Sequence, residues 1–330
     1  MLTERLRRWA TVAVAGAIVL SVTAAARSAV PGTPAAPRLP ALRAGTLHER
    51  YEANHRFITE SRQAALRMGD TARGDALAGF AAPGRQFLSF SPDGDGLAVE
   101  VLGDLAEADR IAVVVPGSDT TIDTFDELGT KSASLNGGAR ALYAEMRRTA
   151  PHTRVAVVAW LGYHAPRTMS RDVASTARAA VGGDELRAFL GRLRSVNATA
   201  PVALLCHSYG SVVCGSAVRG TGRAMQAELS GIAVVGSPGM GVRSAAELRT
   251  AVPLWAARGA SDWITDVPHV EVSVLGHTFG FGTDPVAPSF GARGFAAGPG
   301  GHSDYFRPGG VALHNLALIG LGRGGQVSHG

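Results

Sequence analysis

Five short runs of almost uninterrupted apolar residues constrain the fold of this chain more than any other feature. They are RIAVVVPG at 110–117, RVAVVAWLGY at 154–163, PVALLCH at 201–207, SGIAVVGSPG at 230–239 and VPLWAARG at 252–259. A strand with one face in water alternates apolar and polar residues, whereas a strand covered on both faces does not. We therefore expect an α/β architecture with a mostly parallel central sheet and helices on both faces.

Segments with helical patterns separate these runs. We expect helices at 137–150, 183–196, 210–218 and 308–323, and a short one at 244–251. Before them, 86–91 and 97–102 alternate like a pair of strands around the turn PDGDG, and 270–276 would add a further strand. Residues 70–84 are rich in Gly and Ala and are expected to be irregular. Because ligands bind beyond the carboxyl ends of the strands in open parallel sheets, chemistry is expected just after each apolar run.

The third run ends in Cys-His-Ser-Tyr-Gly at 206–210 and changes at once to a small-residue helical pattern. A sharp strand-to-helix turn exposes a nucleophilic serine, and small residues two positions to either side let the strand and the helix approach. Gly210 meets this need downstream, and Cys206 is small upstream. Ser208 is the predicted nucleophile; the alternative is a structural serine in a tight turn.

The two cysteines of the chain, Cys206 and Cys214, lie on either side of Ser208. We expect two free, buried thiols, because a bridge from the end of a strand to the next helix requires favourable geometry. A disulfide stays open as the alternative, since an exported protein would permit one. No Cys/His cluster has the spacing of zinc ligands, so no metal site is expected.

Polar residues follow later runs in a suggestive order. Asp262 comes after VPLWAARGAS, and His302 lies in GGHSDYF before the last helix. Ser, then Asp, then His is the chain order of an α/β-hydrolase triad, in which the imidazole activates the hydroxyl and the carboxylate holds the imidazole. We predict Ser208, Asp262 and His302 as this triad. The alternatives are Asp266 and Asp284 for the acid, and His269, His277 and His314 for the base.

Backbone N–H groups near the nucleophile would form the oxyanion hole. We predict Tyr209, which follows Ser208, and Ser118 in the loop PGSDTT, with the N–H of Asp119 as the alternative to that of Ser118. Asp119 is also predicted to contact substrate. Tyr163 and His164, which follow the second apolar run, are predicted to form another wall of the substrate pocket.

The first residues predict export. Residues 1–26 combine a basic start with an apolar run and a small-residue cleavage site, the pattern of a signal peptide. The alternative is an uncleaved anchor, with membrane association through residues 9–26. We expect a Pro/Ala-rich linker at 27–45, a helical segment at 46–84 and an α/β-hydrolase domain at 85–330. The protein is therefore expected to be secreted or extracellular, or anchored to the membrane by its first residues.

The blocks VVVPGSDTT, VVAWLGYHAP, ALLCHSYGS, VVGSPGMGV and GGHSDYF resemble an actinobacterial α/β-hydrolase family, DUF1023. The resemblance covers roughly Ala98 to Gly322. It implies an α/β-hydrolase fold with a nucleophile at Ser208 and a base at His302. Members of the family usually have Gly-His-Ser at the turn, so Cys206 is a departure. The family name specifies no substrate.

Taken together, these patterns predict an exported serine hydrolase that acts on carboxylic esters, either small molecules or lipids, without a metal or organic cofactor. The alternatives are an acyltransferase or a peptidase with the same triad, and a non-catalytic binding protein that retains the fold. Nucleic acid is not an expected partner, because the formal charge of +5 is spread along the chain with no basic run containing interleaved aromatic residues.

Overall fold

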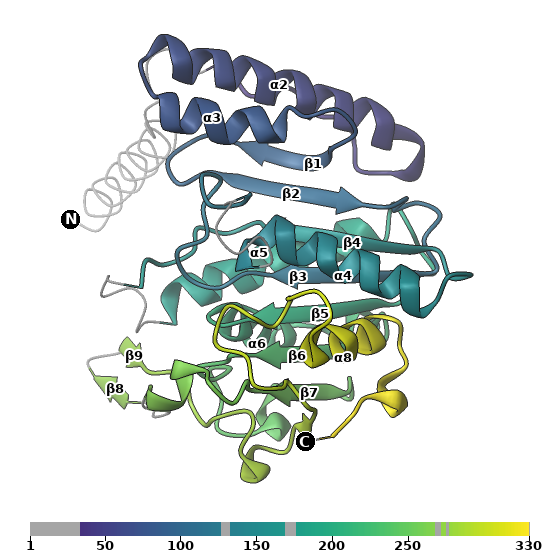
Figure 1. Ribbon diagram of the computed structural model, residues 1–330, viewed down its shortest axis with the longest axis vertical. Coiled ribbons are helices and arrows are strands. Elements are labelled where there is room, and N and C mark those ends of the chain that lie inside the picture. The colour runs from purple at the N-terminus through teal and green to yellow at the C-terminus, as the bar shows by residue number, and fades with distance from the viewer. Residues whose placement is uncertain (1–33, 127–132, 169–175, 268–271, 275–276, 330) are drawn as a thin grey trace, which may run out of the picture.

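An eight-stranded sheet forms the centre of the molecule (Figure 1). The computed structural model describes residues 34–126, 133–168, 176–267, 272–274 and 277–329. The strands are, in spatial order, β1 (Gln86–Ser91), β2 (Leu97–Leu102), β4 (Val155–Leu161), β3 (Arg110–Val115), β5 (Val202–His207), β6 (Leu229–Val235), β7 (Leu254–Ala257) and β10 (Arg293–Gly294). Strand β2 pairs antiparallel with β1 and with β4, and the other pairs are parallel. The mostly parallel sheet of the sequence prediction is confirmed.

Helices cover both faces of this sheet, as its uninterrupted apolar strands require. Helices α4 (Leu135–Thr149) and α8 (Val311–Gly320) pack together on one face, and α5 (Ala177–Leu193) and α6 (Gly210–Arg219) pack together on the other (Figure 1). Each face has its own buried apolar cluster, represented by Leu142 and Leu316 on the first and by Leu186 and Val213 on the second. The short helix α7 (Arg223–Gln226) follows α6.

The edge strand β1 is covered by two helices, α2 (Leu47–Arg67) and α3 (Thr71–Phe80) (Figure 1). Side chains of α2 bond the carbonyl groups of β1 where its register shifts: Arg50 Nε donates to Leu88 O at 2.6 Å and Asn54 Nδ2 to Phe87 O at 2.8 Å. These contacts protect a strand edge that would otherwise be open to other chains.

The expectation of irregular structure at 70–84 is wrong for residues 71–80, which form the regular helix α3. The Asp70 side chain accepts the Arg73 N–H and so caps its first turn. Leu77 and Phe80 are fully buried, and Phe80 stacks on Phe87 with ring centroids 5.1 Å apart. Tertiary burial of these apolar side chains therefore outweighs the weak helical tendency of the glycines.

The segment 244–251, expected to be a short helix, forms the 3₁₀ helix η4 (Ala245–Leu248). The strand expected at 270–276 is present over its described residues as β8 (Val272–Val274), which pairs with β9 (His277–Phe279) in a separate two-stranded sheet. Other 3₁₀ helices in the described ranges are η1 (Ala44–Thr46), η5 (Trp263–Asp266), η6 (Pro288–Phe290) and η7 (Gly324–Gln326). Within the described ranges, none of the helices has both the length and the apolar character needed to cross a bilayer.

Candidate active site

Ser208 lies in the sharp turn between β5 and α6. Its φ of +53° is in the left-handed region, which is strained for a residue other than glycine and recurs at functional sites. Gly210 makes the turn possible, since a Cβ there would lie 2.5 Å from the carbonyl oxygen of Val115 and 2.6 Å from that of Pro116. The turn has the strand–serine–helix geometry of a nucleophile elbow.

The loop after β3 approaches Ser208 closely because it contains Gly117. A Cβ at Gly117 would lie 2.6 Å from the Ser208 Cβ. The next residue, Ser118, lines the cavity at Ser208. The N–H of Asp119 donates to Pro166 O at 3.0 Å. Because this N–H is already engaged, Ser118 is the better of the two candidates for the second oxyanion donor.

The structure brings Ser208, His302 and Asp262 together from three distant segments. His302 Nε2 lies 2.9 Å from Ser208 Oγ, and His302 Nδ1 lies 2.9 Å from Asp262 Oδ1. This arrangement suits an imidazole whose Nδ1–H donates to the carboxylate and whose Nε2 accepts the serine hydroxyl proton. It is the geometry that proton transfer from Ser208 requires.

Three donors hold the buried Asp262 carboxylate. Besides His302, the backbone N–H of Ile264 donates to Oδ1 at 2.9 Å and the Tyr305 hydroxyl donates to Oδ2. The Tyr305 hydroxyl in turn accepts the N–H of Gly259 at 3.0 Å. Burial by itself would raise the pKa of Asp262, but these hydrogen bonds outweigh it and the pKa falls below its usual value. Asp262 is therefore ionised at neutral pH.

His207, directly before the nucleophile, supports the loop that carries His302. Its Nε2–H donates to His302 O at 2.8 Å, and the two ring centroids are 4.8 Å apart. Burial first, and then the neighbouring imidazole, lower the pKa of His207 to about 4, so this histidine is neutral at pH 7. A neutral ring can pack beside His302 without opposing the positive charge that a catalytic base acquires.

Gly236, after β6, is the point at which these groups converge. Its φ is +56°, and an added Cβ would lie 2.9 Å from the Tyr305 ring, 3.0 Å from Asp262 Oδ2 and 3.1 Å from His302 Cε1. Only a residue without a side chain leaves room for all three contacts. The carboxylate, the imidazole and the phenol therefore all pack against the backbone at the end of β6.

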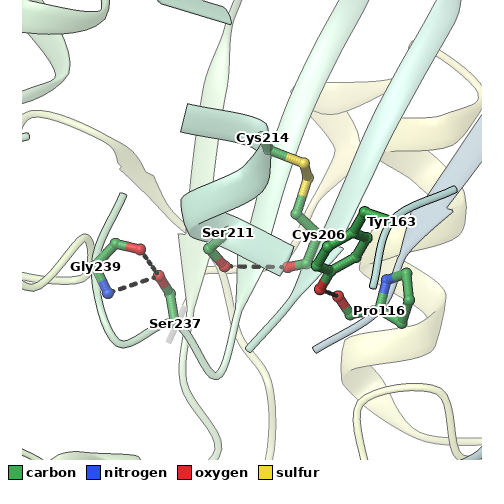
Figure 2. The surroundings of a disulfide bond; sticks show 7 residues. All are labelled: Pro116, Tyr163, Cys206, Ser211, Cys214, Ser237 and Gly239. Carbon is green, nitrogen blue, oxygen red and sulfur yellow. Dashed lines mark hydrogen bonds between the residues drawn. A yellow bond between two sulfur atoms is a disulfide. The ribbon is translucent and has the colours of Figure 1, made fainter. Parts of the chain in front are cut away.

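A disulfide bond joins Cys206 and Cys214, and the expectation of two free thiols is wrong (Figure 2). Cys206 is in β5 and Cys214 is in the second turn of α6. The elbow folds the helix back beside the strand, which places the two Cα atoms 6.6 Å apart, within the range of disulfides. The bond thus spans the turn that carries Ser208, and both sulfur atoms belong to fully buried residues.

A cavity of about 590 Å³ opens at Ser208 and His302. Its described lining includes both predicted oxyanion residues, the predicted contact residue Asp119, and apolar side chains from separate segments: Leu135, Trp263, Ile264, Val267, Phe281 and Phe306. The volume is in the range of sites that hold drug-sized ligands. Among the residues that the structure describes, no group of three or more His, Cys, Asp or Glu side chains is arranged to hold a metal ion.

The structure does not bring Tyr163 or His164 to this cavity, in contrast to the sequence prediction. Tyr163 is buried: it stacks on Trp160 with ring centroids 5.9 Å apart, and its hydroxyl donates to Pro116 O at 2.8 Å (Figure 2). It therefore steadies the loop that carries Gly117 rather than facing substrate. His164 is exposed and does not line the cavity. A strand end fixes which edge of the sheet a residue occupies, but not the direction of its side chain.

The alternative triad members lie elsewhere. Asp266 is exposed, and Asp284 forms an ion pair with Arg258 at 2.5 Å. His314 Nδ1 contacts Glu145 on the face of α4, at 2.8 Å. His277 is in β9, and His269 lies outside the described residues.

Sequence reasoning missed several residues of the site: Tyr305, His207, Gly236 and Trp263. Tyr305 is three positions after His302, in the same GGHSDYF block, but nothing in that spacing indicates that its hydroxyl reaches Asp262, 43 positions earlier. Trp263 directly follows Asp262, and its ring centroid is 4.5 Å from that of His302. Tyr305, His207 and Trp263 each lie within three positions of a predicted triad residue, and this proximity was the available signal for them. Gly236 has no such neighbour in the sequence.

A family model described as alpha/beta hydrolase, Abhydrolase_8, matches residues 91–272. Two uncharacterized proteins of Mycobacterium tuberculosis (strain ATCC 25618 / H37Rv) are similar to the chain. Rv2079 is 27% identical over 260 residues, which cover 71% of this chain and 38% of that protein. Rv0963c is 31% identical over 157 residues, which cover 46% of this chain and 56% of that protein. The chain thus matches only part of the length of each relative.

Solved structures with a similar fold include the serine hydrolase XC6422 from Xanthomonas campestris, with 16% identity and a TM-score of 0.41 over 73% of this chain and 95% of that one. Esterase PE8 has 17% identity and a TM-score of 0.41, over 62% of this chain and 91% of that one. Likenesses this distant say nothing about the activity of the chain.

Proposed function

This chain belongs to the α/β-hydrolase family Abhydrolase_8, also called DUF1023, and we propose that it is a serine hydrolase that cleaves carboxylic esters. The observation that carries the proposal is the continuous series of hydrogen bonds from Ser208 Oγ through His302 to Asp262, each 2.9 Å long. A serine in a left-handed turn that bonds an imidazole is the requirement for nucleophilic acyl transfer.

In the proposed reaction, His302 Nε2 takes the Ser208 hydroxyl proton while Oγ attacks the ester carbonyl carbon. The N–H groups of Tyr209 and Ser118 donate to the resulting oxyanion. The ionised Asp262 carboxylate stabilises the imidazolium, which then gives its proton to the leaving alcohol. An acyl ester remains on Ser208. Water attacks this ester with His302 again as the base, and the carboxylic acid is released. The scheme requires no metal or organic cofactor.

The first test combines covalent labelling with a single substitution. A fluorophosphonate is expected to label the full chain at Ser208, located by mass spectrometry of the modified peptide. Ser208→Ala should remove the labelling and lower kcat for a short acyl ester by roughly 10³-fold or more. Ser195→Ala, at an exposed serine beyond α5, is the matched control and should change neither. Undiminished turnover by folded Ser208→Ala protein would refute the proposal.

Product analysis separates hydrolysis from transfer. Release of the free acid in water without an added acceptor is the expected result. If product forms only with an added alcohol or amine, the chain is an acyltransferase. Cleavage of amides in preference to esters would indicate a peptidase. A folded protein that neither reacts with the fluorophosphonate nor turns over any acyl substrate would be a binding protein that retains the fold.

We also propose that the protein works in an oxidising compartment, reached by export directed by residues 1–26. The support is the Cys206–Cys214 disulfide, because such bonds persist mainly in secreted and periplasmic proteins. Alkylation of the protein isolated from its native cells should find no free thiol, and its first residue should lie near position 27. Two alkylated cysteines would contradict the proposal, and an intact first segment in the membrane fraction would favour the anchored form.

A further inference from the structure

The cavity has an aromatic wall whose position relative to His302 is informative. Trp263 is 51% exposed, although its neighbours Asp262 and Ile264 are each only 3% exposed. The Asp262 side chain accepts the Ile264 N–H at 2.9 Å and so begins the 3₁₀ helix η5. This bond fixes the backbone at Trp263, and the half-exposed indole ring packs beside the His302 ring.

The next apolar residues of this segment extend the same surface. Trp263, Ile264 and Val267 all line the cavity, and we refer to these three residues as the Trp263 wall. A half-exposed indole beside a reactive imidazole is unburied apolar surface that a ligand can cover, and aromatic side chains contribute large contact areas when they do so. The chemistry of the Trp263 wall suits a hydrocarbon group.

The position of the indole indicates which part of an ester it contacts. The Trp263 ring centroid lies 4.5 Å from that of His302. In the proposed reaction the leaving alcohol oxygen receives its proton from His302 Nε2, so it must lie within hydrogen-bond distance of that atom. The carbon atoms attached to this oxygen therefore come next to the imidazole ring and to the indole beside it. The acyl part, in contrast, stays on Ser208 and extends from its carbonyl carbon.

We propose that the Trp263 wall is the subsite for the alcohol part of the ester and that it selects a bulky apolar alcohol, such as an arylmethyl group. This inference rests on the proposed function, because it uses the direction of proton transfer. The cavity of about 590 Å³ is large enough for such a group, whereas a methyl or ethyl ester would leave most of it to water.

The test varies the alcohol at constant acyl group. Acetates of ethanol, butanol, benzyl alcohol and 2-naphthylmethanol are all esters of primary alcohols, so their leaving groups have similar basicity. For the wild-type chain kcat/KM should rise along this series. Trp263→Ala should lower kcat/KM for the naphthylmethyl ester about tenfold to a hundredfold more than it lowers kcat/KM for the ethyl ester. Trp263→Phe should restore much of the preference.

Two controls make the result specific. Val181→Ala removes a 64% exposed apolar side chain of α5 that does not line the cavity, and it should leave the whole series unchanged. Ethyl esters of acetic, butyric and octanoic acid vary the acyl part alone. Trp263→Ala should change their kcat/KM by the same factor, whatever the acyl length.

Three outcomes would overturn the inference: a wild-type chain without preference along the alcohol series, an equal large loss for every ester in Trp263→Ala, or a loss that follows acyl length. The second would mean that Trp263 positions His302, and the third that the Trp263 wall binds the acyl part. In all three cases Ser208-dependent hydrolysis persists and the proposed function stands. If no ester is hydrolysed and Ser208 is not labelled, the proposed function itself fails and the inference fails with it.

Discussion

The disulfide across the nucleophile turn offers the most direct quantitative test. Cys206 and Cys214 are eight positions apart, so the bond closes a short loop in the unfolded chain. With a closed loop of about nine residues, the chain-entropy relation gives a stabilisation of about 2.5 kcal/mol at 25 °C. Reduction leaves two thiols at fully buried positions among apolar side chains, where a free cysteine behaves as a small apolar residue. The effect should therefore come mainly from the unfolded state.

The assay is urea-induced unfolding of one protein in two redox states, followed by tryptophan fluorescence. The chain is unfolded, reduced and refolded in reductant, and is compared with the oxidised chain, so that the side chains are identical. The reduced form should unfold with a free energy about 2.5 kcal/mol lower. For a chain of this length, the difference corresponds to a fall in Tm of roughly 4 °C.

The double variant Cys206→Ala/Cys214→Ala is the control, and its unfolding should not respond to reductant. The reasoning is refuted if the oxidised and reduced forms differ by less than about 0.5 kcal/mol, a fraction of the loop-closure value. It is also refuted if mass spectrometry of oxidised, folded protein finds two free thiols.

Three further predictions concern the surroundings of the nucleophile. Tyr305→Phe removes a donor to the predicted triad carboxylate, so the Asp262–His302 pair should bind a proton more strongly and the acid limb of the kcat/KM–pH profile should move to higher pH. An unmoved profile would make the phenol purely structural. Gly210→Ala places a Cβ 2.5 Å from the carbonyl oxygen of Val115 and should lower the free energy of unfolding by about 1–3 kcal/mol and remove most of the activity. Gly191→Ala is the control, because a Cβ at this position of α5 would meet no described atom outside the helix backbone nearer than 3.8 Å. Thermal unfolding should find it neutral or stabilising. The pKa of His207 is about 4 in the folded chain against the ordinary 6.5, so as the pH falls the unfolded chain binds this proton first. This histidine should therefore lower the free energy of unfolding by about 2 kcal/mol between pH 7 and pH 4.5. In His207→Gln the fall in the free energy of unfolding between these two pH values, measured by urea titration, should be smaller by that amount.

Local sequence patterns were sufficient for the sheet and for the nucleophile turn. Uninterrupted apolar runs at 110–117 and 201–207 form the parallel strands β3 and β5, because burial on both faces leaves no place for alternating polar residues. The turn at Ser208 is likewise local, since Gly210 permits the close approach of helix and strand within a few residues. The chain order of Ser208, Asp262 and His302 then followed from the general order in this fold.

Only the tertiary structure decided which loop side chains meet. The contact between His302 and Ser208 spans 94 positions and that between Tyr305 and Asp262 spans 43, and no periodicity links such residues. For the same reason the sequence predicts Tyr163 in the substrate pocket, whereas in the structure its hydroxyl donates to Pro116 O. Side-chain direction in a loop is set by packing against distant elements, whereas strands and helices impose it through their own repeat. Sequence alone therefore determined the sheet and the positions of the polar residues at its edge, and the packing of loops against one another determined which of them form the candidate site.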